Sequence, residues 1–278
     1  MQNLKRFSRN YGAVLGALIL ALIVAMAILA PVLFPGNPWN SVGPPMLPPF
    51  EESAFPLGTD MLGRDIATGI AHGAKVSLLI GVISTLVAVL IGVGIGAVAG
   101  FHGGRIDDLL MRFTEFFQII PAFAMAVVLV AIFSPSLVSI TLAIAAVSWP
   151  SVARLVRAEF LSLREREFVK AAVVIGQKPS RIILTQILPN AVSPIIVTAS
   201  LMVATAILTE SALSFLGLGD RNMMSWGFMI GAARTMLREA WWMSFFPGIA
   251  ILLAVLSINL IGEGINDVMN PHLRGRRH

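Results

Sequence analysis

The order of apolar and polar positions divides the chain into six long apolar runs separated by polar segments. Each run is close to the roughly 20 residues that a helix rising about 1.5 Å per residue needs to cross a hydrocarbon layer of about 30 Å. Backbone N–H and C=O groups in lipid have to be satisfied internally, so we expect the runs to be helices. The six runs lie at 12–34, 77–100, 113–133, 137–155, 192–213 and 245–264. The pattern predicts an all-α, polytopic membrane protein with six transmembrane helices.

The first run has a second interpretation, a cleaved signal peptide. Basic residues Lys5, Arg6 and Arg9 precede it, and Ala25 and Ala27 form a small-x-small pair. However, the run is longer than the roughly 7–15 apolar residues of a signal peptide, and the alanine pair lies inside it. We therefore expect an uncleaved first helix.

Two polar segments at 35–75 and 216–244 separate apolar runs on the same predicted side. The first is rich in proline up to Pro56, which predicts irregular structure. From Thr59 or Asp60, as a cap, apolar residues recur at helical spacing, so we expect a short helix that lies along the outer membrane surface. The second segment carries tryptophans expected to anchor it at the membrane interface, namely Trp226, Trp241 and Trp242.

Composition supports the membrane assignment, since 56% of the residues are hydrophobic and only 13% are charged. The formal net charge of +5 does not indicate nucleic-acid binding, because the basic residues are distributed among the ends of apolar runs. Without cysteine, the chain has no disulfide, no thiolate metal site and no cysteine nucleophile.

The distribution of Lys and Arg predicts the orientation, because cytoplasmic loops carry an excess of both. One side of the six runs receives fifteen of them: Lys5, Arg6, Arg9, Arg105, Arg112, Arg154, Arg157, Arg164, Arg166, Lys170, Lys178, Arg181, Arg274, Arg276 and Arg277. The other side receives five: Arg64, Lys75, Arg221, Arg234 and Arg238. Both termini and the loop at 164–190 are therefore predicted to be cytoplasmic.

The apolar runs carry no ionisable side chain at mid-membrane. Glu115, Glu210 and Glu263 fall near run ends, and no histidine lies in any run. A proton- or ion-coupled transporter normally needs such groups. The polar residues within the runs are mostly hydroxyls and amides, and the candidates for lining a pathway are Ser148, Thr198, Thr205 and Asn259. Hydrogen bonding between helices is the other interpretation of these four residues.

Small residues also recur in the second run. Gly92, Gly96 and Gly100 form a stripe at a spacing of four, which favours close approach of another helix.

Motifs for nucleotide hydrolysis, proteolysis and metal binding are absent from the sequence. There is no G-x-x-x-x-G-K-[ST], H-E-x-x-H or G-x-S-x-G. The four histidines are isolated in the sequence, namely His72, His102, His272 and His278. We therefore expect a non-catalytic chain with no metal or cofactor, and any ATP has to be hydrolysed by a partner.

The loop at 164–190 has the composition of a projecting helix–turn–helix. Charges of alternating sign are followed by good helix formers, and Gly176 can end the first helix in a left-handed conformation. A second helical stretch is predicted from Arg181 to Leu188, ending at Pro189. The alternative is a solvated loop whose charges only enforce topology.

This loop resembles the Glu-Ala-Ala loop of ABC importer permeases. Matches to its Glu-Ala-Ala…Gly…Ile-x-Leu-Pro pattern are Ala171, Ala172, Gly176, Leu188 and Pro189, while Lys170 replaces the glutamate and Gln186 the isoleucine. Three further segments are similar to the C-type permeases of dipeptide and oligopeptide importers: 55–65 with 73–78, ESALSFLGLG at 210–219, and 225–227 with 246–248. Together the similarity covers most of the chain from Phe55 to Pro271.

The resemblance implies a type I ABC importer fold in a bacterial inner membrane. It implies a second homologous permease, two cytosolic ATPases that hold ATP and Mg, and an extracytoplasmic binding protein. We divide the chain into 1–75, with the N-terminal segment, first helix and outer loop, and 76–278, a five-helix permease core with its coupling loop at 156–191. The residues that the resemblance assigns to ATPase coupling are Glu167, Phe168, Lys170, Ala171, Ala172, Gly176, Leu188 and Pro189.

Two other function classes and several substrates stay open at this point. A self-sufficient secondary transporter or channel needs no ATPase, and a membrane scaffold recruits partners without transport. Within the importer family, dipeptides, oligopeptides, glutathione and nickel chelates are all substrates of similar permeases.

Overall fold

The computed structural model describes residue 8 and residues 10–269, and this part of the chain is almost entirely helical. Its only β pairing is an isolated bridge between Thr59 and Asp65. Helices α2 to α11, with the π-helices η1 and η2, have these bounds: α2 Tyr11–Leu33, α3 Ile66–His102, α4 Gly104–Ile119, α5 Ala122–Phe133, α6 Leu137–Arg164, α7 Glu167–Val174, α8 Pro179–Ile182, η1 Ile183–Ile187, α9 Leu188–Leu213, η2 Ser214–Leu218, α10 Trp226–Ala233 and α11 Trp242–Met269. The all-α prediction is confirmed. The terminal basic residues that contributed to the orientation lie outside the described residues, namely Lys5, Arg6, Arg9, Arg274, Arg276 and Arg277.

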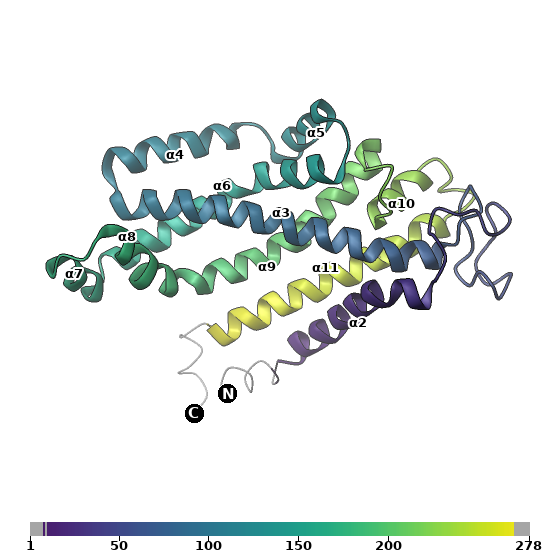
Figure 1. Ribbon diagram of the computed structural model, residues 1–278, viewed down its shortest axis with the longest axis horizontal. Helices are drawn as coiled ribbons and strands as arrows, with labels where there is room; N and C mark the ends of the chain where they lie inside the picture. Colours follow the sequence, from purple (N-terminus) through teal and green to yellow (C-terminus); the bar gives the residue numbers. More distant parts are fainter. Residues whose placement is uncertain (1–7, 9, 270–278) are drawn as a thin grey trace.

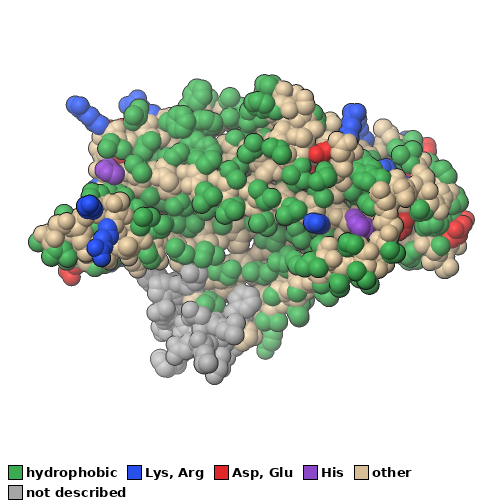
Figure 2. Space-filling model, viewed as in Figure 1, with side chains coloured by type: hydrophobic (Ala, Val, Ile, Leu, Met, Phe, Trp, Pro, Cys, Tyr) green, Lys and Arg blue, Asp and Glu red, His purple; other side chains and the backbone are tan. Residues whose placement is uncertain are grey.

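The long helices form an elongated bundle with two distinct ends (Figure 1). The tip with α7 and α8 lies at one end, and the irregular segment at 34–65 lies with α10 at the other. On the face in Figure 2, apolar side chains cover the middle, and most charged side chains lie toward the two ends. This distribution is typical of a protein whose middle section faces lipid.

The described residues contain five helical stretches that are long and apolar enough to span a membrane, or six if a bent pair is counted as one span. That pair is α4 and α5, which meet at an angle of 81°. The prediction of one helix at 113–133 is therefore wrong. Ile120 is extended, with φ −86° and ψ 132°, because the following Pro121 disfavours the helical conformation in the residue before it.

The second span is longer than predicted, because α3 includes most of the segment that was expected to form a separate surface helix. Helix α3 begins at Ile66, where the Asp65 carboxylate accepts hydrogen bonds from the N–H groups of Ala67 and Thr68. The expected helix starting at Thr59 or Asp60 is wrong, since Asp60 instead closes a turn by accepting from the backbone N–H groups of Leu62 and Arg64. The outer part of α3 is therefore continuous with its membrane-spanning part.

The fifth span also continues through a predicted stop. The chain is helical from Pro179 to Leu218, and Pro189 lies inside this stretch. The π-helix η1 directly precedes Pro189, and the N–H of Leu188 bonds to the carbonyl of Ile183, five residues back. Because the wider π turn displaces the carbonyl that a proline ring would meet, the helix does not end there. The predicted stop at Pro189 is therefore wrong.

The glycine stripe on α3 lies against α6 at close range, which confirms the prediction. A Cβ atom built on Gly92 would lie 2.5 Å from the Cβ of Val152, and one built on Gly100 would lie 2.6 Å from the Cβ of Phe160. Both partners belong to α6. Because these positions of α3 carry no side chain, the side chains of α6 pack directly against the backbone of α3.

The tryptophans of the second outer segment lie mostly in the core. Trp226 is 0% exposed and donates from its Nε1 to the carbonyl of Ile70, 2.9 Å away. Trp242 is also buried and donates to the carbonyl of Thr59, whereas Trp241 is half exposed. The expectation of three interfacial anchors is therefore wrong for Trp226 and Trp242, because each indole N–H finds a backbone acceptor inside the fold.

Candidate functional site

Helix α7 forms the tip of the loop between α6 and α9, and its end is fixed by a glycine. Gly176 has φ +75°, as the sequence predicts. Its N–H bonds to the carbonyl of Val173, and the N–H of Gln177 bonds to the carbonyl of Ala172. This pair of bonds is the Schellman arrangement, in which a left-handed residue satisfies the last carbonyls of a helix. The turn therefore directs the chain back toward the membrane-spanning part at α8.

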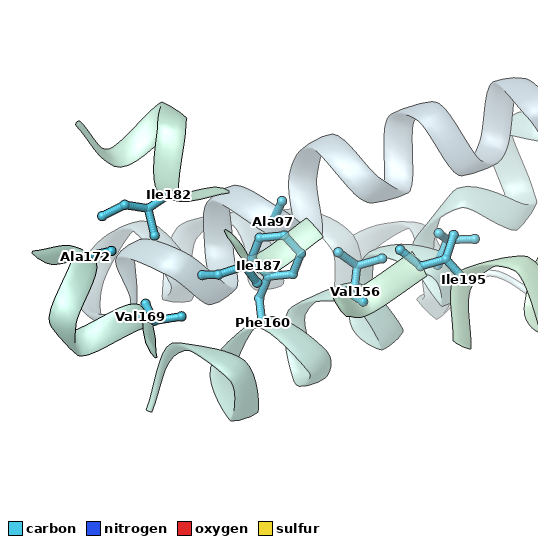
Figure 3. Close-up of a cluster of buried hydrophobic side chains, with 10 residues drawn as sticks. Ala97, Val156, Phe160, Val169, Ala172, Ile182, Ile187 and Ile195 are labelled. Atoms are coloured by element: carbon cyan, nitrogen blue, oxygen red, sulfur yellow. The ribbon is translucent and has the colours of Figure 1, made fainter. Parts of the chain in front are cut away.

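One face of α7 is fastened to the bundle. Val169 is 1% exposed and Ala172 is 4% exposed, and both belong to one buried cluster with Phe160 of α6 and Ile187 of η1. Figure 3 shows the side chains of this cluster, which come from α3, α6, α7, α8, η1 and α9. A displacement of α7 therefore cannot occur without a displacement of the helix ends packed against it, because protein interiors are close-packed.

The rest of the α7 surface is exposed, and together with the C-cap residue it carries four large apolar side chains. Val174 is 86% exposed, and Phe168, Val173 and Ile175 are also exposed. We call these four residues the apolar tip. Helix α7 lies at one end of the bundle (Figure 1), and apolar side chains cover the middle (Figure 2). Exposed apolar clusters outside lipid mark surfaces that bind another protein.

Some of the predicted coupling residues are exposed, and others are buried or half-buried. Five of them are exposed on α7 or in the turn after it, namely Glu167, Phe168, Lys170, Ala171 and Gly176. Ala172, on α7, is buried against the bundle. Leu188 is half-buried and Pro189 is exposed, both at the start of α9.

The sequence-based assignment of the coupling residues does not include Val173, Val174 and Ile175, which the structure shows to be exposed. Three consecutive apolar residues on a short helix cannot all face the core. The apolar run itself therefore indicates that part of it is exposed.

An ion pair spans the junction between α6 and α7. The Nζ of Lys170 lies 3.2 Å from the Oε2 of Glu165, and the Nε of Arg164 lies 3.6 Å from its Oε1. The hydrogen bond from Lys170, aided by the charges of both basic residues, lowers the pKa of Glu165 below its ordinary value. The carboxylate therefore stays charged at neutral pH, and its partner Lys170 stands at the position where the Glu-Ala-Ala pattern of the resemblance has a glutamate.

Replacing Gly176 by valine is expected to disrupt the end of α7 and to reduce the transport that the resemblance implies at least about tenfold, because a β-branched residue is strained at positive φ. Space is not the reason, since a Cβ there would meet nothing within 4 Å. The matched variant Gly176→Asn should keep most activity, because asparagine tolerates the left-handed region. The measurement is substrate uptake normalised to the amount of the protein in the membrane. Equal activity of both variants would show that the backbone turn is unimportant.

The four candidates for lining a pathway lie on three helices. Thr198 and Thr205 are on α9, Ser148 is on α6 and Asn259 is on α11, and both α6 and α11 pack against α9. Thr205 is exposed and the other three are half-buried. Within the described part of the chain, no hydrogen bond joins any two of the four. The structure thus places them around α9 without forming a polar cluster.

Comparison with known proteins identifies the family. Residues 92–275 match the model of the binding-protein-dependent transport system inner membrane component, and residues 2–49 match the N-terminal transmembrane domain of oligopeptide transport permease C. The chain is 39% identical over 274 residues to the di/tripeptide transport system permease protein DppC of Pseudomonas aeruginosa, covering 96% of this chain and 90% of the relative. It is 38% identical over 272 residues to the oligopeptide transport system permease protein OppC of Haemophilus influenzae, covering 96% and 86%.

The fold is shared with a solved ABC transporter. An inward-facing structure of the MetNI methionine ABC transporter matches with a TM-score of 0.61 and 16% identity, covering 73% of this chain and 97% of that chain. Permeases of this family are non-catalytic transmembrane subunits that work with ATPases and binding proteins. The chain therefore belongs to the family of inner membrane components of binding-protein-dependent transport systems, as a permease subunit of an ABC importer.

Proposed function

We propose that this chain is the C-type permease of a peptide importer and that α7 is its coupling helix. The observation that carries the proposal is that Val169 and Ala172 pack α7 onto the bundle while the four residues of the apolar tip stay exposed. A cytosolic ABC ATPase would cover the tip. The tip and both termini would then face the cytoplasm, in agreement with the distribution of Lys and Arg.

Coupling follows from this packing. The partner ATPases would hold ATP and Mg, and their closure would displace α7. Through the cluster around Phe160, the displacement would reach the ends of α3, α6 and α9, which form part of the membrane-spanning bundle. ATP and delivered substrate then act on the same inward–outward equilibrium, each by its differential affinity for the two states.

Dipeptides and oligopeptides are the substrate class that the relatives favour, since their names specify di/tripeptide, dipeptide and oligopeptide transport. The pathway would form jointly with a second homologous permease. The half of the pathway contributed by this chain would offer hydroxyl and amide groups, namely those of Ser148, Thr198, Thr205 and Asn259. Such groups can hydrogen-bond a peptide backbone without selecting one side chain, because the backbone offers the same donors and acceptors in every peptide.

The family assignment argues against the two alternative function classes. A secondary transporter or channel would work without ATPases, and a scaffold would not transport, whereas permeases of this family act in ATP-driven import.

Reconstituted uptake tests the proposal. The complete complex with its binding protein, in proteoliposomes containing ATP, should take up radiolabelled trialanine. A complex with a hydrolysis-deficient ATPase should not. Uptake without ATP, or no uptake of any di-, tri- or oligopeptide from a complex that hydrolyses ATP, would overturn the peptide-importer assignment.

A further inference from the structure

A cavity of about 280 Å³ opens at the outer end of the bundle, between η2 and α10. It lies at the end opposite to the apolar tip, where Figure 1 places α10. Its walls come from two segments that are close in space, and the lining residues are Ser214, Gly217, Gly219, Arg221, Phe228, Gly231, Ala232, Arg234 and Thr235. The volume is slightly below the range of about 300–1,000 Å³ typical of pockets for drug-sized ligands, so it suits one end of a peptide.

Glycines shape the cavity and position one of its cations. Gly217 has φ +87°, and a Cβ on it would lie 3.0 Å from the Nη1 of Arg234. The same Nη1 donates a hydrogen bond to the carbonyl of Phe215, 3.1 Å away. The guanidinium of Arg234 is thus held against the backbone of η2, and its other N–H groups remain available to a ligand.

The cavity presents two cations without acidic partners. Within the described residues, neither Arg221 nor Arg234 forms an ion pair. The neighbouring Asp220 is engaged elsewhere, because its Oδ2 accepts from the N–H of Leu137 and its Oδ1 from the N–H of Asn222.

A buried carboxylate, Glu210, lies behind the cavity wall but does not line it. Its Oε1 accepts hydrogen bonds from the hydroxyls of Ser214, at 2.9 Å, and Ser225, at 2.8 Å. The surface that faces the open space therefore carries positive charge, and the nearest acids are bound to other groups.

We propose that this cavity binds the C-terminal carboxylate of a peptide as the peptide passes from the binding protein to the permease. The inference rests on the proposed function, because it assigns a site to the proposed substrate. Guanidinium groups bind carboxylates in a forked, charge-assisted geometry that a neutral amide cannot reproduce. Peptides of different sequence share this carboxylate, so the site recognises the class and is indifferent to side chains.

Thiol labelling measures the proposed site without requiring transport. The chain contains no cysteine, so Thr235→Cys places a single thiol on the cavity wall, and Asn40→Cys places a control thiol on the other outer segment. The purified complete complex is labelled with an anionic and a cationic methanethiosulfonate. We expect the ratio of anionic to cationic rates to be about tenfold higher at position 235 than at position 40, since clustered charge concentrates counter-ions. Trialanine should slow labelling at position 235, and trialanine amide should not.

Variants of the arginines complete the test. In the Arg221→Gln/Arg234→Gln background, the rate ratio at position 235 should fall to the value at position 40, and protection by trialanine should disappear. Arg221→Gln alone serves if the double variant does not fold, because Arg221 makes no hydrogen bond within the described residues. The matched control is Arg238→Gln, an outer arginine that does not line the cavity. Equal rate ratios at the two positions, or equal protection by the acid and the amide, would overturn the inference.

The labelling result and the uptake result separate the two proposals. Protection at position 235 without any peptide uptake would leave the site and remove the importer function proposed above. ATP-driven trialanine uptake without selective protection would leave the importer function and remove the site.

Discussion

Val174→Asp is expected to abolish ATP-dependent uptake while leaving the permease folded in the membrane. Val174 is 86% exposed and is the most exposed residue of the apolar tip, so the substitution removes little packing within the chain. In the complex, it would place a charge in a desolvated apolar interface, where central residues contribute about 2 kcal/mol or more to binding. We expect uptake to fall to a few per cent and the ATPases to be lost during purification. Uptake in proteoliposomes and the recovery of ATPase on the tagged permease are the measurements.

Val42→Asp is the matched control for this prediction. Val42 is 54% exposed on the outer segment, at the opposite end of the bundle. The same change of chemistry there should leave ATPase recovery unchanged. Normal uptake and normal ATPase recovery in the Val174→Asp variant would show that the apolar tip is not the docking surface.

The second large effect concerns the pairing of α3 with α6. Gly96→Leu is expected to lower the apparent Tm by at least about 5 °C, because overpacking costs about 1–3 kcal/mol or more. A Cβ on Gly96 would lie 2.8 Å from the Cβ of Val156 and 3.0 Å from the backbone nitrogen of Arg157. Backbone atoms cannot move aside as a side-chain end can, so the two helices have to separate. Loss of the monodisperse peak after heating at a series of temperatures measures the change.

Gly94 supplies the control on the same helix. A Cβ there would meet nothing within 4 Å, so Gly94→Leu should leave the Tm unchanged or raise it slightly through better helix propensity. An equal decrease in Tm for both variants would show that the close pairing of α3 with α6 at Gly96 does not determine the stability.

The sequence was sufficient to locate the apolar segments, apart from the break within 113–133, and to identify the surface of α3 that packs against α6. Apolar length identified the positions of the membrane-spanning segments, because a bilayer imposes the same requirement on every span. The spacing of Gly92, Gly96 and Gly100 identified the surface where α6 packs. Both features are local in sequence, which is why they could be predicted.

Features that depend on tertiary partners were not predictable in the same way. The sequence suggests a membrane-interface position for Trp226, but its indole N–H donates to the carbonyl of Ile70 in α3, which is distant in sequence. The continuation of the helix through Pro189 depends on a π turn, which has no clear sequence signal. The break at Pro121 was visible as a proline, but the apolar run around it dominated the prediction.

In the loop at 164–190, the sequence predicted the turn that ends α7 but not which side chains of α7 are exposed. Gly176 adopts the left-handed conformation that its place after the helix indicated. The resemblance singled out Ala172, which the structure buries, and the exposed apolar tip extends over Val173, Val174 and Ile175. A short helix between two turns can be rotated by its packing, so the sequence alone did not determine which face is exposed.

Site-specific cross-linking at α7 tests the central claim most directly. The chain has no cysteine, so Val174→Cys and the buried Val169→Cys on the same helix each introduce one thiol. With a short thiol-to-amine cross-linker on native membranes, Val174→Cys should yield a product that mass spectrometry identifies as this permease joined to a P-loop ATPase. Val169→Cys should yield none. An adduct with another protein, or none from Val174→Cys in membranes that contain the assembled complex, would contradict the account.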